Sequence, residues 1–174
     1  MSRLITLEGP GGSGKTTLGY SLQNSLPKSV CYDLDDYIDP IYDSSQHLSE
    51  KDRMKRIERS LMDGLKTFRS DLKEGKDVIV PYWSFSAAKE VQGLVREIDN
   101  LDREGNFRVI RFMLESPLER CIQGDASRDK YLGAGHITNV WGQVYQGIDS
   151  RHILVPNHDY MAQKRVEDHL RYLH

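Results

Sequence analysis

One short segment, Gly9-Pro10-Gly11-Gly12-Ser13-Gly14-Lys15-Thr16, matches the pattern G-x-x-x-x-G-K-[ST] without interruption. It follows an alternating apolar run from Arg3 to Glu8, and after it come leucines at helical spacing, Leu18, Leu22 and Leu26. Glycines let consecutive backbone N–H groups turn inward around a polyphosphate, and the positive end of the following helix faces the same anion. A strand, this loop and a helix in that order predict a phosphate-binding loop rather than an ordinary glycine-rich turn.

The loop residues divide into three roles. Lys15 is expected to reach the β and γ phosphates of ATP, and Thr16 to offer its hydroxyl to Mg²⁺. The remaining phosphate contacts are expected from Gly9, Gly11, Gly12, Ser13 and Gly14, with Thr17 beside the loop. The predicted cofactors are therefore ATP and Mg²⁺.

The whole-chain composition narrows the class of protein. Its length of 174 residues suits one domain, residues 1–174, with a proper core. The formal net charge is −2, and without a basic excess wide contact with nucleic acid is disfavoured. Cys31 and Cys121 lack metal-ligand spacing and are expected to be buried thiols in a reducing compartment. No apolar run approaches membrane length, so we expect a cytoplasmic protein without membrane contact.

Apolar periodicity predicts five strands, over residues 3–8, 29–34, 77–80, 107–114 and 152–155. Helices are predicted to begin near residues 15, 49, 91, 116, 137 and 160, the helix at 116 with Ser116 as its cap and Pro117 in its first position. Strands that alternate with helices in this way predict a three-layer α/β fold. Its centre is a five-stranded parallel sheet with helices on both faces.

An acidic cluster, Asp33, Asp35 and Asp36, falls at the end of the predicted strand 29–34. In open α/β sheets the chemistry gathers beyond the carboxyl ends of the strands, so the cluster should stand beside the phosphate loop. The alternative is an acidic turn exposed to solvent.

Three aromatic side chains follow the predicted strand 77–80, at Tyr82, Trp83 and Phe85. They could stack on a planar substrate, or they could cap the core, and the sequence favours neither.

Basic residues follow the fourth predicted strand and are themselves followed by glycines. Arg120, Arg128 and Lys130 precede Gly133 and Gly135, a composition that suits a basic lid over residues 120–136 closing on a transferring phosphate. The alternative is a basic helix end in solvent.

This order of elements resembles the nucleoside and nucleotide kinase-like group of P-loop phosphotransferases, over nearly the whole chain. Asp35-Asp36-Tyr37 resembles the Asp-Asp-aromatic motif of uridine kinases and polynucleotide 5′-hydroxyl kinases. The resemblance implies that Asp35 takes the proton of the acceptor hydroxyl, with Asp36 and Tyr37 at the substrate. Pro81-Tyr82-Trp83-Ser84-Phe85 resembles the uridine kinase segment Pro-x-Tyr-x-Phe, which places Tyr82, Trp83 and Phe85 at the substrate. Ile153 to Asn157 resembles the last strand and nucleotide-base loop, which places Asn157 at the cofactor.

The chain departs from this pattern at three positions. Ala88 stands where uridine kinases carry a histidine. Pro81 takes the place of an aspartate that usually ends the third strand in shorter relatives, so metal binding falls to Thr16 and a second-strand carboxylate such as Asp33. Gly124 stands where an arginine is favoured, which leaves Arg128 as the predicted transition-state cation.

Phosphoryl transfer requires mainly alignment and neutralisation of charge, and the predicted parts supply both. The sequence predicts an ATP-dependent kinase acting on a hydroxyl of a nucleoside-like small molecule. One alternative is a kinase of a hydroxyl on nucleic acid, either a 5′ end or a hydroxymethylated base. Another is a nucleotide-binding ATPase switch. The sequence does not indicate an oligomeric state.

Overall fold

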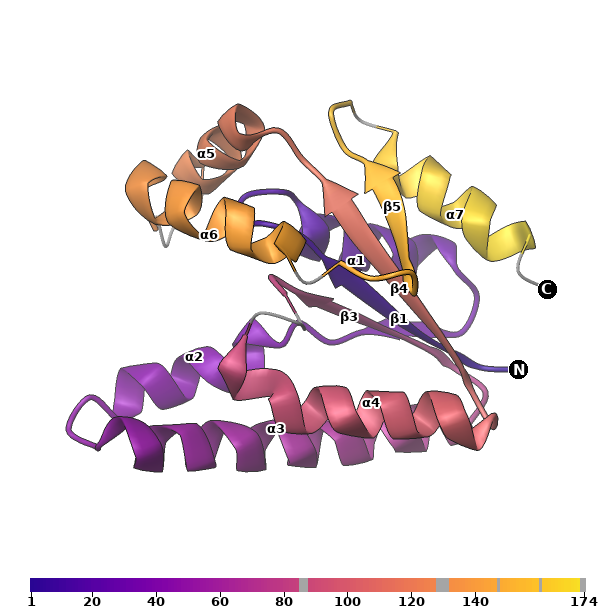
Figure 1. The fold of residues 1–174 in the computed structure, drawn as a ribbon. Helices are drawn as coiled ribbons and strands as arrows, with labels where there is room; N and C mark the ends of the chain where they lie inside the picture. Colours follow the sequence, from indigo (N-terminus) through magenta and orange to yellow (C-terminus); the bar gives the residue numbers. More distant parts are fainter. Residues whose placement is uncertain (85–87, 128–131, 147, 160, 173–174) are drawn as a thin grey trace.

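The computed structural model describes residues 1–84, 88–127, 132–146, 148–159 and 161–172. Its centre is a sheet of five parallel strands in the order β2-β3-β1-β4-β5 (Figure 1). The strands are β1 (Arg3–Glu8), β2 (Ser29–Cys31), β3 (Asp77–Tyr82), β4 (Arg108–Glu115) and β5 (His152–Pro156). The predicted α/β class and the five-stranded parallel sheet are confirmed.

Helices cover both faces of the sheet, as predicted (Figure 1). Side chains alternate along β1, so Leu4 packs in the core on the side of α3 and α4, whereas Ile5 packs in the core against α1 and α7. The helices are α1 (Lys15–Ser25), α2 (Asp35–Ser44), α3 (Glu50–Lys73), α4 (Gln92–Glu104), α5 (Leu118–Ala126), α6 (Ala134–Gln146) and α7 (Ala162–Tyr172), with a short turn of 3₁₀ helix, η1 (Lys89–Val91), before α4.

The acidic cluster lies at a junction that differs from the predicted one. β2 ends at Cys31 rather than at residue 34, and a helix that the sequence did not predict, α2, begins at Asp35. The turn between them is held by the Asp33 carboxylate, which accepts the backbone N–H of Asp35 at 3.1 Å. Helix α2 carries Pro40 in its interior and only one buried residue, Ile38, so it lacks the apolar stripe that reveals a helix.

The N-cap of α5 differs from the predicted one, which was Ser116. Pro117 occupies the N-cap position and Ser116 precedes it, with its hydroxyl accepting a hydrogen bond from the Asn157 side chain at 2.9 Å. The helix ends at Ala126. No described helix combines the length and apolar content needed to cross a bilayer.

Candidate functional site

The phosphate loop connects β1 to α1, as the motif predicts. Gly12 and Gly14 adopt left-handed backbone conformations, with φ of 73° and 84°, that favour glycine. Gly14 is the N-cap of α1 and brings no side-chain hydrogen bond, so no side chain competes for the backbone N–H groups at this helix start. Lys15 Nζ lies 3.1 Å from the carbonyl oxygen of Pro10, across the loop. This arrangement can receive the phosphates of a nucleotide.

Two oxygen-bearing side chains, those of Thr16 and Asp33, meet at the start of α1. The Thr16 hydroxyl donates to the Asp33 carboxylate at 2.7 Å, and Asp33 is 8% exposed. The described residues contain no group of three or more His, Cys, Asp or Glu arranged to hold a metal. A hydroxyl and one carboxylate nevertheless suit Mg²⁺, which usually takes few protein ligands and keeps phosphate oxygens and waters. Asp33 lies just after β2, the strand next to β3, and could replace the acid missing at Pro81.

A cleft of about 520 Å³ opens over the loop. One wall is formed by the loop and the start of α1, including Lys15, Thr16 and Thr17. The other wall is acidic and is formed by Asp33, Asp35, Asp36 and Asp39. Burial, together with the negative charges of Asp33 and Asp39, raises the pKa of Asp36. The structure thus brings the predicted acidic cluster beside the phosphate loop, where a bound cation would relieve its mutual repulsion.

A second cavity of about 320 Å³ adjoins the cleft. Gly11 and Lys15 line it from the loop, and Asp35 and Asp39 line it from α2. Its remaining walls carry Trp83, Glu90, Leu132, His136, Ile137 and Val140. We call it the acceptor cavity. Lys15, Asp35 and Asp39 line both the cleft and the acceptor cavity, so the two spaces meet at these side chains.

Helix α5 lies directly on the phosphate loop through two glycines. A Cβ atom on Gly12 would lie 2.0 Å from the carbonyl oxygen of Cys121, and one on Gly124 would lie 2.2 Å from the carbonyl oxygen of Gly12. An arginine at position 124 cannot be accommodated at this separation, which explains the departure seen in the sequence. Asp125 then accepts the backbone N–H groups of Leu132 and Gly133, which ties α5 to the segment before α6.

Of the predicted lid cations, Arg120 is the one that the described part of the chain includes. Arg120 donates to the carbonyl oxygen of Asp159 at 3.3 Å and lines neither the cleft nor the acceptor cavity. Arg128 and Lys130 lie outside the described residues, as does Phe85.

Two of the predicted substrate-binding residues, Tyr82 and Tyr37, make side-chain contacts within the protein. Tyr82 is 3% exposed, packs in the core and donates its hydroxyl to Glu90 at 2.7 Å. Tyr37 packs edge-on against Phe68, with ring centroids 6.2 Å apart, and its ring also lies against Gly64 of α3. Trp83 is half-buried and lines the acceptor cavity.

Asn157 braces the phosphate loop instead of facing a nucleotide base. The side chain is buried, and its amide nitrogen donates to the Ser13 carbonyl oxygen at 2.6 Å and to the Ser116 hydroxyl at 2.9 Å. Both amide hydrogens are therefore used inside the protein.

A buried contact between a carboxylate and an imidazole ring lies behind the loop and was not predicted from the sequence. Glu8, directly before Gly9, is 0% exposed, and its carboxylate lies 3.1 Å from His152 Nε2. The other ring nitrogen lies 3.0 Å from the carboxylate of Asp149. The hydrogen bond with Glu8 raises the pKa of His152, in opposition to burial. The available signal was a glutamate ending an otherwise apolar strand, because such a side chain needs a partner.

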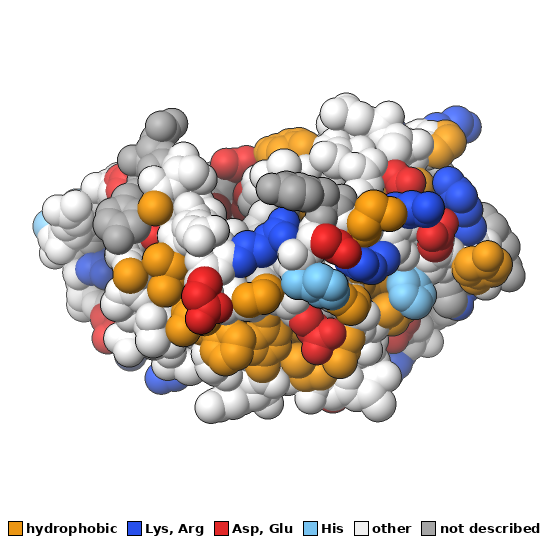
Figure 2. Space-filling view, turned by 90° about the horizontal axis from the view of Figure 1, so that it is seen from above, with side chains coloured by type: hydrophobic (Ala, Val, Ile, Leu, Met, Phe, Trp, Pro, Cys, Tyr) orange, Lys and Arg blue, Asp and Glu red, His pale blue; other side chains and the backbone are white. Residues whose placement is uncertain are grey.

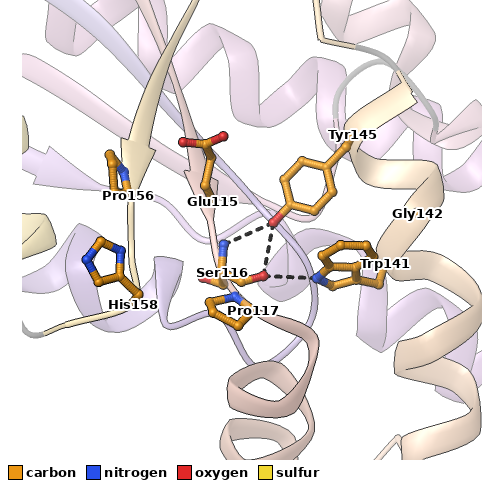
Figure 3. A pocket seen from close by; sticks show the side chains of 8 residues that line it. All are labelled: Glu115, Ser116, Pro117, Trp141, Gly142, Tyr145, Pro156 and His158. Carbon is orange, nitrogen blue, oxygen red and sulfur yellow. Dashed lines mark hydrogen bonds between the residues drawn. The ribbon is translucent and has the colours of Figure 1, made fainter.

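A third cavity, of about 570 Å³, lies beyond α6 (Figure 3). Tyr145 and Trp141 face it from α6, and His158 and Pro156 face it from the end of β5 (Figure 3). The Trp141 ring nitrogen donates to the Ser116 carbonyl oxygen at 2.9 Å, and the Tyr145 hydroxyl accepts the Ser116 N–H at 3.0 Å. None of its described lining residues belongs to the phosphate loop, so these contacts serve to anchor α6.

Fold and loop together define a P-loop α/β protein, and solved structures with this fold are similar over nearly the full chain. The tunicamycin resistance protein of Deinococcus radiodurans is 19% identical, with a TM-score of 0.63 over 99% of this chain and 96% of that one. A sugar kinase from Janibacter is 15% identical, with a TM-score of 0.65 over 99% and 95%. A shikimate kinase from Acinetobacter baumannii, bound to shikimate, is 17% identical, with a TM-score of 0.62 over 99% and 93%.

At these identities the likeness establishes the fold. No protein-family model matches the sequence, and no curated protein matches it.

Proposed function

We propose that this protein is an ATP-dependent kinase that transfers the terminal phosphate to a hydroxyl group of a small molecule. The observation that carries the proposal is the position of Lys15 and Asp35. Both side chains line the cleft over the phosphate loop and also the acceptor cavity. A reacting hydroxyl and a terminal phosphate could therefore meet between them. That a sugar kinase and a shikimate kinase share the fold supports the same reaction class.

The described residues divide the work of phosphoryl transfer. The backbone from Gly11 to Lys15 binds the donor phosphates, and the Lys15 ammonium group offsets charge on the transferring group. Bound at Thr16 and Asp33, Mg²⁺ supplies further neutralisation of the phosphates. Asp35 orients the acceptor hydroxyl and accepts its proton. Arg128 remains the proposed transition-state cation on the strength of the sequence alone.

The acceptor cavity favours a small acceptor. A volume of about 320 Å³ suits a compact molecule, and Trp83 in its wall supports a flat body such as that of a nucleoside. A hydroxyl on nucleic acid is disfavoured by the acidic walls and by the net charge of −2. On the face in Figure 2, basic side chains of the described residues lie among acidic and hydrophobic ones rather than in one stripe.

Substitution of Asp35 tests the proposal. Asp35→Asn removes the proton acceptor and is expected to lower turnover by on the order of a hundred- to ten-thousand-fold. ATP affinity, measured by calorimetry with Mg²⁺, should stay nearly unchanged because the loop is intact. Asp43→Asn, an exposed aspartate at the far end of α2, is the matched control and should keep full turnover.

Unchanged turnover in Asp35→Asn would remove Asp35 from its role. Release of phosphate from ATP with no phosphorylated product, across a broad panel of alcohols, would instead favour the ATPase switch.

A further inference from the structure

The charge of the acceptor cavity points to the kind of acceptor. Three carboxylates line it, Asp35 and Asp39 from α2 and Glu90 from η1. Asp35 and Asp39 are four residues apart and so lie on the same face of α2. Among the described lining residues the cation is Lys15, which belongs to the phosphate loop. Besides Lys15 and the three carboxylates, the titratable side chain among them is the exposed His136.

Glu90 is held in the cavity wall by a neutral partner. Its carboxylate accepts the hydroxyl of Tyr82 at 2.7 Å, and Tyr82 is fixed in the core. Burial, followed by the negative charge of Glu90, raises the pKa of Tyr82 far above its ordinary value, so the phenol stays a donor. The contact positions the carboxylate without bringing a positive charge to it.

The cavity is also lined by apolar side chains. Trp83 directly follows β3, and Ile137 and Val140 lie on α6, where Leu132 joins them from the segment before the helix. An acceptor in this cavity therefore meets both hydrocarbon and carboxylates. The face of an indole ring also attracts organic cations.

We propose that the acceptor is a compact alcohol carrying an ammonium group beside an apolar ring or chain, with Glu90 recognising the ammonium group. This inference rests on the kinase function proposed above. A carboxylate- or phosphate-bearing acceptor would bring like charges together in a partly desolvated cavity, which is strongly unfavourable. An ammonium group gains a charge-assisted hydrogen bond in the same place.

The chemistry at the hydroxyl is ordinary phosphoryl transfer. The acceptor oxygen forms a bond to the terminal phosphorus of ATP while the bond from that phosphorus to the bridging oxygen breaks, and ADP leaves. The hydroxyl proton passes to Asp35, and nothing is oxidised or reduced. Glu90 touches the acceptor away from the reacting atoms, so its role is specificity.

Three probes of one skeleton test the inference. Phenylethanolamine, styrene glycol and mandelate share a phenyl ring and a secondary alcohol and differ in one end group, which is an ammonium, a hydroxyl or a carboxylate. Their affinities are measured by calorimetry, and phosphorylated product is identified by mass spectrometry with ATP and Mg²⁺ present. Phenylethanolamine should bind about tenfold more tightly than styrene glycol, and mandelate should bind most weakly.

Glu90→Gln keeps the shape of the side chain and an oxygen that can accept from Tyr82, so the variant should fold. It should abolish the preference for the amine over styrene glycol. Glu104→Gln, which removes the same charge from an exposed position on α4, should keep the preference.

Three results would overturn the inference. They are a wild-type affinity for styrene glycol or mandelate that equals or exceeds that for the amine, a preference that persists in Glu90→Gln, and no binding of the amine. Failure of the kinase proposal has a separate signature, because the protein would then fail to bind ATP with Mg²⁺ or to phosphorylate any alcohol.

Discussion

Glu8 and His152 show how a single pair of residues can support the phosphate loop from behind. Glu8 ends β1 immediately before the loop, and His152 begins β5, with β4 between them. The imidazole ring lies between the carboxylates of Glu8 and Asp149. Two cations lie nearby, Arg151, which pairs with Asp149 and Asp99, and Arg111, which is in register with His152 and pairs with Asp99. The pair joins the outer strand to the strand that carries the loop.

The contact between Glu8 and His152 predicts that the unfolding free energy of the protein depends on pH. The pKa of His152 is raised in the folded protein above its ordinary value of about 6.5, chiefly by Glu8. A raised folded pKa stabilises the protein fully below about pH 6.5, and the contribution is lost as the pH rises through the folded pKa. The difference in unfolding free energy between wild type and His152→Gln should therefore be largest near pH 6 and shrink toward pH 9, as measured by urea titration.

The exposed His47 provides the control, since His47→Gln should give no such trend. A difference between wild type and His152→Gln that stays constant with pH would show that the ring acts only through packing.

At the scale of elements, the contact between α5 and the phosphate loop is made by backbone rather than by side chains. Gly12 and Gly124 approach so closely that neither position tolerates a Cβ atom without movement of the other element. Helix α5 therefore fixes the outer edge of the loop.

Gly124→Ala tests this contact. Alanine favours a helix more than glycine does, but here its methyl group meets the carbonyl of Gly12. We expect a net loss of about 1–3 kcal/mol in unfolding free energy, together with weaker ATP binding, because the loop must shift. Urea titration and calorimetry measure the two effects.

Gly142→Ala is the matched control, since a Cβ on Gly142 of α6 meets no atom within 4 Å. It should gain about 0.4–1 kcal/mol. Wild-type stability and wild-type ATP affinity in Gly124→Ala would refute the close contact.

Periodicity predicted the long elements well and the site side chains less well. Helix α3 has a regular apolar stripe and begins after Ser49, close to the predicted start, with the Ser49 hydroxyl accepting the backbone N–H of Asp52. Tyr82 was harder to place, because β3 runs to residue 82 instead of 80 and that position faces the core. Asn157 is a surface residue by type, and only tertiary structure brings it to the Ser13 carbonyl.

At the scale of the whole molecule, the fold brings together segments that are far apart in the chain. The loop after β1, the start of α2, the end of β3 and helix α6 all contribute to the two spaces that meet at Lys15 and Asp35. In the proposed function the backbone of the loop binds the nucleotide phosphates, so nucleotide binding should stabilise the folded state as a whole.

Mg²⁺-ATP at a hundred times its Kd should stabilise the wild-type protein by about 2.7 kcal/mol. For a domain of this size that corresponds to a rise in Tm of about 5–10 °C, measured by a thermal shift assay. Lys15→Ala should lose most of the rise because the ammonium group at the phosphates is gone. Lys66→Ala, an exposed lysine on α3, should retain it. If Mg²⁺-ATP left the Tm of the wild-type protein unchanged, that result would contradict nucleotide binding by the loop.

Ser116 connects the phosphate loop to helix α6, which borders the acceptor cavity. Through Asn157 it reaches the carbonyl of Ser13, and through Trp141 and Tyr145 it holds the helix whose other face borders the acceptor cavity. Substitutions at Val140 could therefore change acceptor preference without touching the phosphate loop, whereas Ile137 packs against Gly11 of the loop. Changes at Trp141 or Tyr145 would disturb the Ser116 contacts that also support the phosphate loop. New specificities should therefore evolve along one side of α6 only.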